Sequence, residues 1–391
     1  MRSYVRLLSV FVLILSLFGR CDPVAYAQEN EPAAATQEAE TRQIRVRFVE
    51  GVRVHAFSCT YSDTCFYAPA TQDQPELAML SVLGAASTYT KIGGRGRNYA
   101  SLMMEKCGFT PKDGYLFSAN GEKSSAYTGF STSEDNDHCR VQLGCRAIPQ
   151  SDPQMVVIAV FLNGYTRDQM EWLSNFNVGE GDDHAGFHAA AEEACTLVSS
   201  YAEECRQLYG EEVQYKFWIT GHSRAAAIAN ILAIDLTEEY GEEHVYAYGF
   251  ATPAYSKSQT NYENIKNYVI PGDIVPKVVP EEWGFYRNDD GAGEAHQIPV
   301  SSGMKRIFRR LAGKRYQGFS DEDSDRLVKE LLATGIRQEN YEKEQDQLRQ
   351  AAEELSAGDY WERVRMLNGF GDAHRILSYI AGIAALGGST M

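Results

Sequence analysis

A serine at the junction of an apolar run and an alanine-rich run is the strongest chemical signal in this sequence. Ser223 follows the apolar stretch 213–219 and precedes the alanine-rich stretch 224–233, with the small residues Gly221 and Ala225 two positions to either side. A strand, a sharp turn and a helix in that order hold a serine in a strained conformation with its hydroxyl exposed, provided that the flanking residues are small. The helix start also brings a positive dipole end to the serine. The pattern predicts a nucleophilic serine.

A nucleophilic serine needs an imidazole to take its proton and a carboxylate to orient that imidazole. On sheets with this kind of turn, the partners follow along the chain in the order acid, then histidine. Asp273 lies in the loop after the apolar run 267–270, where a parallel sheet presents its functional groups, and His374 lies near the C-terminus. We therefore expect Ser223, Asp273 and His374 to form a catalytic triad.

Other histidines and acids offer alternatives. His296 is the alternative general base, because the long segment around it obscures which histidine returns to the serine. His222, inside the turn, is expected to pack beside the serine rather than relay protons. Asp182, Asp183 and His184 together resemble a metal site, but an acidic helix N-terminus is the preferred interpretation. No metal and no cofactor are expected.

The elements around these residues predict an α/β architecture. Helical patterns cover 184–209 and the residues after Ser223, and they separate short apolar runs typical of strands buried on both faces. Such alternation predicts a mostly parallel sheet with helices on both faces. A peripheral hairpin is expected within 43–68, followed by helices around 77–86 and from Tyr99 to before Gly108. The predicted central strands are 155–162, 213–219, 245–250 and 267–270.

Four motifs lie along this part of the chain: DHAGF at 183–187, TGHSRAAAIANILA at 220–233, YGFATP at 248–253 and GDIVP at 272–276. With these motifs the sequence resembles the class 3 lipases, the triacylglycerol-lipase-like branch of the α/β-hydrolases, over about residues 75–280 and the last histidine. The resemblance implies an α/β-hydrolase fold and the triad roles for Ser223, Asp273 and His374. It also implies a carboxylic ester as substrate, for example an acylglycerol or phospholipid, cleaved through an acyl-enzyme.

Two positions depart from the family pattern. Ala225 replaces the second glycine of the serine turn, and Asn163-Gly164-Tyr165 replaces an Arg-Gly-Thr or Arg-Gly-Ser segment whose hydroxyl binds the oxyanion. The backbone N–H groups of Tyr165 and Arg224 are then the expected oxyanion donors, and losing one donor typically costs about 100-fold or more in rate. The alternative function is therefore a catalytically weak or silent hydrolase-like module that binds lipid or glycan.

The N-terminus predicts export. Basic residues, the apolar run 7–18 and Ala25-Tyr26-Ala27 indicate a signal peptide over residues 1–27, so the mature protein is expected to be secreted, extracellular or associated with the cell surface. An uncleaved anchor is the alternative, and lipidation of Cys21 is disfavoured by the bulky Arg20 before it. Residues 28–42 have the composition of a disordered linker, and 43–391 form the hydrolase domain.

A helical insertion is expected at about 281–368, before the catalytic histidine. Its basic block at 305–315 precedes an acidic block at 321–325, and Ser320 with Asp323 predicts a helix start. The insertion is interpreted either as solvated cap helices or as a lid whose basic block contacts an anionic lipid surface or polymer. Nucleic acid is an unsuitable partner, because the chain carries a net charge of −16.

The cysteines permit disulfides but do not define their pairing. Seven remain after the signal peptide, so at least one thiol is expected to be free. The close pairs Cys59/Cys65 and Cys139/Cys145 are candidates for short disulfide loops, which an exported protein can form.

Overall fold

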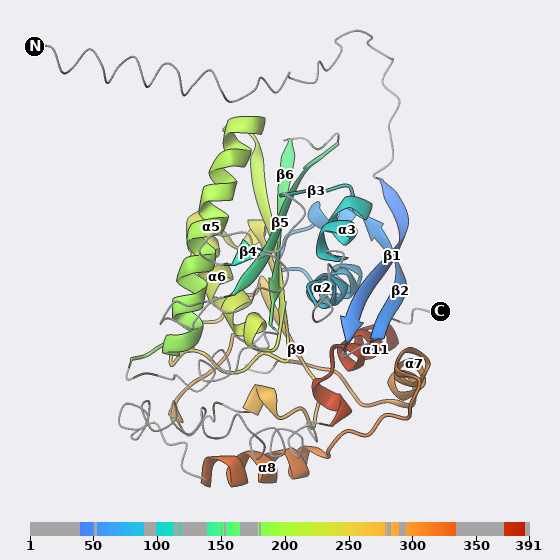
Figure 1. Cartoon of the computed structure of the whole chain (residues 1–391). Coiled ribbons are helices and arrows are strands. Elements are labelled where there is room, and N and C mark those ends of the chain that lie inside the picture. The colour runs from blue at the N-terminus through green and yellow to red at the C-terminus, as the bar shows by residue number, and fades with distance from the viewer. Residues whose placement is uncertain are drawn as a thin grey trace, which may run out of the picture. The chain divides into compact units, whose positions relative to one another are not determined.

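The chain folds around one mixed β-sheet (Figure 1). The computed structural model describes residues 40–50, 53–89, 99–112, 117–118, 139–149, 151, 154–164, 179, 181–277, 279, 283–288, 295–333 and 371–387. The expected signal peptide, nearly all of the expected linker and residues 334–368 of the insertion lie outside the described residues. β1 begins at Thr41, two residues before the expected start of the domain.

The central strands of the sheet are parallel, as the alternating pattern predicted. Along the sheet the order is β10-β9-β8-β7-β6-β5-β3, and β4 also pairs with β5. The pairs from β6 to β10 are parallel, whereas β5, β3 and β4 are antiparallel to their neighbours. The strands are β3 (Thr110–Pro111), β4 (Phe117–Ser118), β5 (Arg140–Ile148), β6 (Met155–Asn163), β7 (Gln214–His222), β8 (Val245–Phe250), β9 (Ile265–Val269) and β10 (His296–Gln297).

Helices cover both faces of this sheet. α5 (Ala185–Tyr209) and α6 (Arg224–Tyr240) lie on one face, and α2 (Pro75–Ser87), α3 (Tyr99–Lys106) and α11 (Ile376–Leu386) lie on the other (Figure 1). The reason is visible along β7, where successive side chains point to opposite faces. Phe217 and Ile219 join the core under α5 and α6, while Trp218 joins the core under α2. These layers define an α/β-hydrolase fold, which confirms the predicted fold class.

The predicted hairpin forms a separate two-stranded sheet. β1 (Thr41–Glu50) pairs antiparallel with β2 (Arg53–Ser62), and a short 3-10 helix, η1 (Asp63–Phe66), follows. Apolar side chains of β1, including Val46 and Phe48, are buried in the core that α2 shares with the main sheet. The alternation that predicted these strands thus reflects one face packed on the domain.

The helical insertion begins with two amphipathic helices. α7 (Ser302–Ala312) packs against α11, and α8 (Asp321–Ala333) crosses the end of the sheet where the parallel strands finish (Figure 1). The predicted start of α8 is confirmed, because the Ser320 hydroxyl accepts from the Asp323 N–H at 3.0 Å and contacts its carboxylate at 2.7 Å. None of the described helices is long and apolar enough to cross a membrane.

Strand β5 was not predicted from the sequence. Its extended backbone excludes the candidate disulfide between Cys139 and Cys145. Cys139 directly precedes β5 and Cys145 lies within it, so extended backbone separates their Cα atoms by roughly 20 Å. A disulfide needs Cα atoms within about 7 Å. Cys59 lies in β2 and Cys65 lies in η1, and no disulfide joins them. No disulfide links any of the other described cysteines either.

Candidate active site

Ser223 occupies a strained turn between β7 and α6. Its φ of 62° and ψ of −135° lie in a region that residues with a side chain rarely adopt. The turn is held in place because the Ser223 N–H donates to the Phe250 carbonyl, at the end of the adjacent strand, at 2.8 Å. The strain is therefore imposed by the sheet, as expected for a serine whose hydroxyl must project beyond the strand ends.

The requirement for small neighbours is met differently on the two sides of Ser223. A Cβ at Gly221 would lie 2.2 Å from the Ala225 carbonyl oxygen, so only glycine fits there. Ala225 itself is fully buried and its methyl group is accommodated. The alanine that departs from the family pattern is thus compatible with the turn.

Substituting Gly221 by alanine is expected to destabilise the domain by about 3 kcal/mol or more, because backbone must move to admit the methyl group. Thermal unfolding measures the loss. Gly303→Ala is the matched control, since Gly303 lies in the first turn of α7 and a Cβ there has no neighbour closer than 3.5 Å. Equal unfolding temperatures for the two variants would contradict the close approach at Gly221.

Asp273 lies in the loop after β9, buried at the same sheet edge as the serine turn. Only 1% of its surface is exposed. Its carboxylate accepts from the Val275 N–H at 3.0 Å through Oδ1 and from the Tyr379 hydroxyl at 2.6 Å through Oδ2. Gly272 permits the turn, with φ of 87°. A buried carboxylate with these donors remains anionic and fixed in orientation.

His374 meets this carboxylate although the two residues are 101 positions apart. Its Nδ1 lies 3.1 Å from both Asp273 oxygens, and about a fifth of the His374 side chain is exposed. Because a carboxylate only accepts, Nδ1 carries the proton and Nε2 is the nitrogen that can accept one. Burial alone would raise the pKa of Asp273, but His374, Tyr379 and the Val275 N–H together hold it below its usual value.

The loop that carries His374 is anchored on both sides. His374 ends η6 (Asp372–His374), in which the buried Asp372 carboxylate accepts from the Gln317 N–H at 2.8 Å. The same carboxylate pairs with Lys314 at 2.7 Å and Arg375 at 3.1 Å. α7 and the segment after it thus position the histidine loop.

Tyr379, on α11, was not identified from the sequence. The contribution of its hydroxyl to the stability of the fold can be tested. Tyr379→Phe removes the hydrogen bond to Asp273, which should cost about 1–2 kcal/mol of stability near neutral pH. The ionised Asp273 stabilises the fold above its ordinary pKa, and this stability is lost as pH falls through the lowered folded-state value. Since the variant raises that value, its acid-side loss of stability should begin at a higher pH.

Unfolding curves between about pH 2 and 7 measure this shift. Tyr262→Phe is the control, because its hydroxyl contacts Glu238 at an exposed site, 3.2 Å away. If Tyr379→Phe loses stability over the same acidic pH range as the wild type, the hydroxyl does not stabilise the carboxylate.

His222 directly precedes the serine, its ring lies against that of His374 with the centroids 5.0 Å apart, and it has a definite tautomer. Its Nε2 donates to the His374 carbonyl at 3.1 Å, and its Nδ1 accepts from the Tyr89 hydroxyl at 2.7 Å. Burial and the neighbouring His374 lower the pKa of His222 to about 3, so it stays neutral. His222 thereby joins the serine turn directly to the histidine loop. Tyr89 follows α2, and no sequence motif marked it.

The expected oxyanion segment is described only in part. Tyr165 lies outside the described residues. Gly164 packs against the serine turn so closely that a Cβ there would lie 2.0 Å from the His222 carbonyl oxygen. Arg224 is the first residue of α6, directly after Ser223, and is buried. The strand end before Tyr165 and the helix start at Arg224 therefore flank Ser223.

The other histidines that the sequence offered as site residues lie away from Asp273. His296 lies on β10, 3.7 Å from Asp73 and stacked on Tyr268, so the histidine that meets Asp273 is His374. His184 is the N-cap of α5 and stacks on Phe187, in agreement with the helix-terminus interpretation.

Comparisons with known proteins find one family model and several solved structures that are similar to this chain. Residues 157–283 match the family model for Lipase (class 3), a segment that contains the serine turn and Asp273. Among solved structures, a triacylglyceride lipase of Rhizomucor miehei is similar, with 16% identity over 57% of this chain and 79% of that chain and a TM-score of 0.34. A mono- and diacylglycerol lipase of Aspergillus oryzae shares 18% identity over 56% of this chain and 78% of that chain, with a TM-score of 0.37. The comparison with curated proteins gives no match.

The layered sheet and the strand–turn–helix around Ser223 define an α/β-hydrolase. The solved structures cover little more than half of this chain. The narrower classification, as lipase-like, therefore depends on the family match of residues 157–283. Residues 157–283 are similar to the class 3 lipases, and the protein is a lipase-like ester hydrolase.

Proposed function

We propose that this protein is a secreted serine hydrolase that cleaves carboxylic esters through Ser223, His374 and Asp273. His374 Nε2 takes the proton of the Ser223 hydroxyl as its oxygen attacks the ester carbonyl, and returns it to the leaving alcohol. The resulting acyl-enzyme is hydrolysed by a water that His374 activates in the same way. Asp273 stabilises the imidazolium that forms in each step.

The observation that carries the proposal is the contact of His374 Nδ1 with both oxygens of the buried Asp273 carboxylate, 3.1 Å each. Structural ion pairs of histidine and aspartate are common on surfaces, but here the carboxylate is buried and also accepts from Tyr379. His222, the residue before the strained Ser223, donates to the His374 carbonyl and so links the serine turn to this pair. A strained serine and an oriented imidazole are what acyl transfer requires.

The oxyanion that develops on the substrate is assigned to the backbone N–H groups of Arg224 and Tyr165. The Arg224 N–H lies at the N-terminus of α6, where the helix dipole favours a developing negative charge. The ester class is an acylglycerol or a phospholipid, in keeping with the lipase family match of residues 157–283.

The test is labelling by a fluorophosphonate probe, with hydrolysis of p-nitrophenyl acetate, butyrate and palmitate measured in parallel. An activated Ser223 is labelled, and mass spectrometry of the labelled peptide should place the adduct on that residue. A folded protein that resists the probe and leaves all three esters intact would favour the alternative of a silent module that binds lipid or glycan.

Export is a second part of the proposal. Residues 1–27 have the basic start, apolar run and Ala-Tyr-Ala end of a signal peptide. Sequencing the N-terminus of the protein recovered from the medium should begin at Gln28. Recovery only from the membrane fraction with Met1 retained would support an anchor instead.

The exposed face of α7 is proposed to bind an anionic lipid surface. Five basic side chains on α7 and just after it are exposed, and none of them forms an ion pair within the described residues. The opposite face of α7, with Met304, Ile307 and Phe308, is buried. In a chain of net charge −16 this local positive surface is complementary to anionic headgroups, and it adjoins the His374 loop through Lys314. The five are Lys305, Arg306, Arg309, Arg310 and Arg315.

Replacing Arg309 and Arg310 by glutamine is expected to weaken binding to vesicles of phosphatidylglycerol by about tenfold or more, at about 1 kcal/mol per charge. Vesicle sedimentation at low and high salt measures it. Lys112→Gln with Lys257→Gln is the matched control, because both lysines already have acidic partners, Glu204 and Asp182. Equal losses in the two double variants would indicate a non-specific charge effect.

A further inference from the structure

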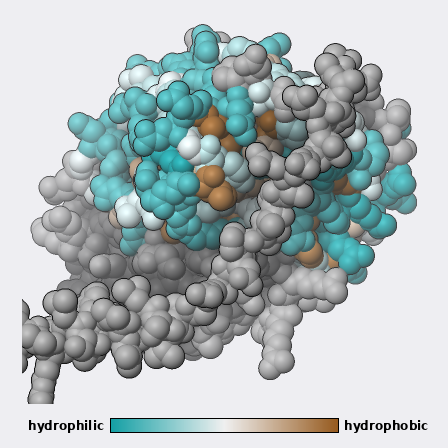
Figure 2. Space-filling model, turned by 90° about the horizontal axis from the view of Figure 1, so that it is seen from above, coloured by the Kyte–Doolittle hydropathy of each residue, from teal (hydrophilic) through white to brown (hydrophobic). Residues whose placement is uncertain are grey.

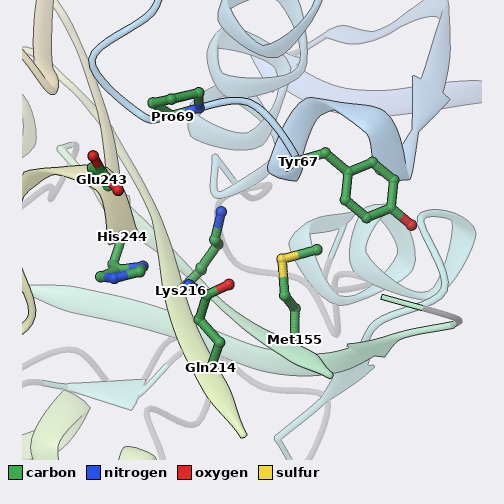
Figure 3. Close-up of a pocket in the computed structure, with 7 residues that line it drawn as sticks. All are labelled: Tyr67, Pro69, Met155, Gln214, Lys216, Glu243 and His244. Carbon is green, nitrogen blue, oxygen red and sulfur yellow. The ribbon is translucent and has the colours of Figure 1, made fainter. Parts of the chain in front are cut away.

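A hollow lies at the opposite edge of the sheet from Ser223. It has a volume of about 220 Å³ and opens at the amino ends of β6 and β7, beside the short 3-10 helix η2 (Glu242–His244) (Figure 3). β7 runs for nine residues between this hollow and the serine turn, which is roughly 25 Å of extended chain. The hollow is thus separate from the candidate active site. Its lining residues are Tyr67, Pro69, Met155, Gln214, Lys216, Glu243 and His244.

Lys216 places a buried positive charge on the wall of this hollow. Only 5% of the residue is exposed. Its ammonium donates to the Phe66 carbonyl at 2.7 Å and to the Tyr246 hydroxyl at 3.0 Å, both of them neutral acceptors. No carboxylate among the described residues lies within ion-pair distance of it. The third N–H of the ammonium has no polar partner in the part of the chain that the structure describes.

Lys266, on β9 at the same sheet edge, is a buried lysine whose positive charge has a carboxylate partner. It is equally buried, donates to the Thr71 carbonyl at 2.9 Å and has the Asp73 carboxylate at 3.3 Å. A buried charge without a counterion is costly, and burial accordingly lowers the pKa of Lys216, with the more distant Glu243 opposing the effect. Lys216 thus differs from Lys266 in having no carboxylate partner among the described residues.

His244 is the second polar group facing the hollow. Its Nδ1 is buried and has no hydrogen-bond partner within the described residues. Burial and the positive charge of Lys216 lower the pKa of His244, so the two groups disfavour each other's protonation. An anion between them would favour the charged form of both. In Figure 3, Glu243 and His244 lie on one side of the Lys216 side chain, and Met155 and Tyr67 lie on the other.

The hollow also limits the size and charge of what it can hold. Its volume is that of about seven water molecules at about 30 Å³ each, well below that of sites for larger ligands. Met155 and Pro69 provide apolar wall for a short alkyl chain. Glu243 is exposed at the rim and repels a second negative charge. The face of the molecule that is seen from above is mostly hydrophilic, with a few hydrophobic residues near its middle (Figure 2).

We propose that this hollow binds a small monocarboxylate, with the carboxylate between Lys216 and His244 and the short alkyl chain against Met155 and Pro69. The site is independent of the chemistry at Ser223.

Isothermal titration of the full chain with sodium butyrate tests the proposal, with butyramide as the neutral isostere and inorganic phosphate as the multiply charged probe. We expect a millimolar Kd for butyrate, at least tenfold weaker binding of butyramide, and weaker binding of phosphate than of butyrate. The NMR signal of His244 should titrate at a higher pH when butyrate is bound, which distinguishes this site from butyrate held near Ser223.

Three variants locate the binding. Lys216→Met should abolish it, and Glu243→Gln should tighten it about threefold or more by removing the repelling charge. Glu242→Gln is the matched control, since this neighbour does not line the hollow. Butyrate that binds no better than butyramide, or equal effects of Glu243→Gln and Glu242→Gln, would overturn the proposal. Should Lys216→Met not fold, the Glu243 comparison and the His244 titration decide the question.

Discussion

Alanine at position 223 is expected to lower kcat for ester hydrolysis by about 10⁴-fold or more, because the nucleophile is lost while the rest of the site remains. The fold should be unaffected, since the backbone strain at Ser223 is imposed by the turn and alanine needs no more room. Initial rates with p-nitrophenyl butyrate, together with the unfolding temperature, measure both effects. Fluorophosphonate labelling should disappear in the same variant.

Ser258→Ala provides the matched control for this comparison. Ser258 is an exposed serine whose hydroxyl contacts Thr260 at 3.0 Å, remote from the turn. It should retain wild-type rates and labelling. A Ser223→Ala protein that keeps more than about a tenth of the wild-type rate would remove Ser223 from the mechanism, whatever the geometry around it.

The second large effect is expected from Asp273→Asn, which should lower kcat by about 10⁴-fold. The amide has nearly the same shape, but its NH₂ group donates where the carboxylate accepts. His374 would then keep its proton on Nε2 and could not take one from Ser223. The Tyr379 hydroxyl can still donate to the amide oxygen, so we expect a much smaller change in unfolding temperature than in rate.

Asp321→Asn is the control for a carboxylate in the same neighbourhood. Asp321 accepts from the Gly272 N–H at 3.3 Å and pairs with Lys277 at 2.7 Å, without contact to His374. It should change kcat by less than about tenfold. If both variants lose activity equally, the role of Asp273 would be to hold its loop rather than to orient the imidazole.

The elements with a continuous apolar run or a clear apolar period could be predicted from the sequence. β6, β7 and β8 are runs of apolar residues buried on both faces, and α5 and α6 have apolar stripes, so their type follows from local pattern alone. Ser223 could be located in the same way, because the strand, the turn and the helix around it are contiguous in the chain. Strand β5 has a mixed pattern with Gln142 and Arg146, and it was missed. Both side chains are buried only because of distant partners: Gln142 meets Ser101, and Arg146 pairs with Asp63.

The sequence by itself determined two things: that a nucleophilic serine lies in the turn at Ser223, and that alternating strands and helices surround it. Which histidine meets Asp273 was decided only by the tertiary structure, since His296 and His374 were both admissible along the chain. β10 brings His296 to Asp73, whereas η6 brings His374 to Asp273. Tyr89 and Tyr379 were likewise undetectable beforehand. A hydrogen bond between residues more than a hundred positions apart leaves no local pattern, because it depends on where whole elements pack rather than on the sequence within any one of them.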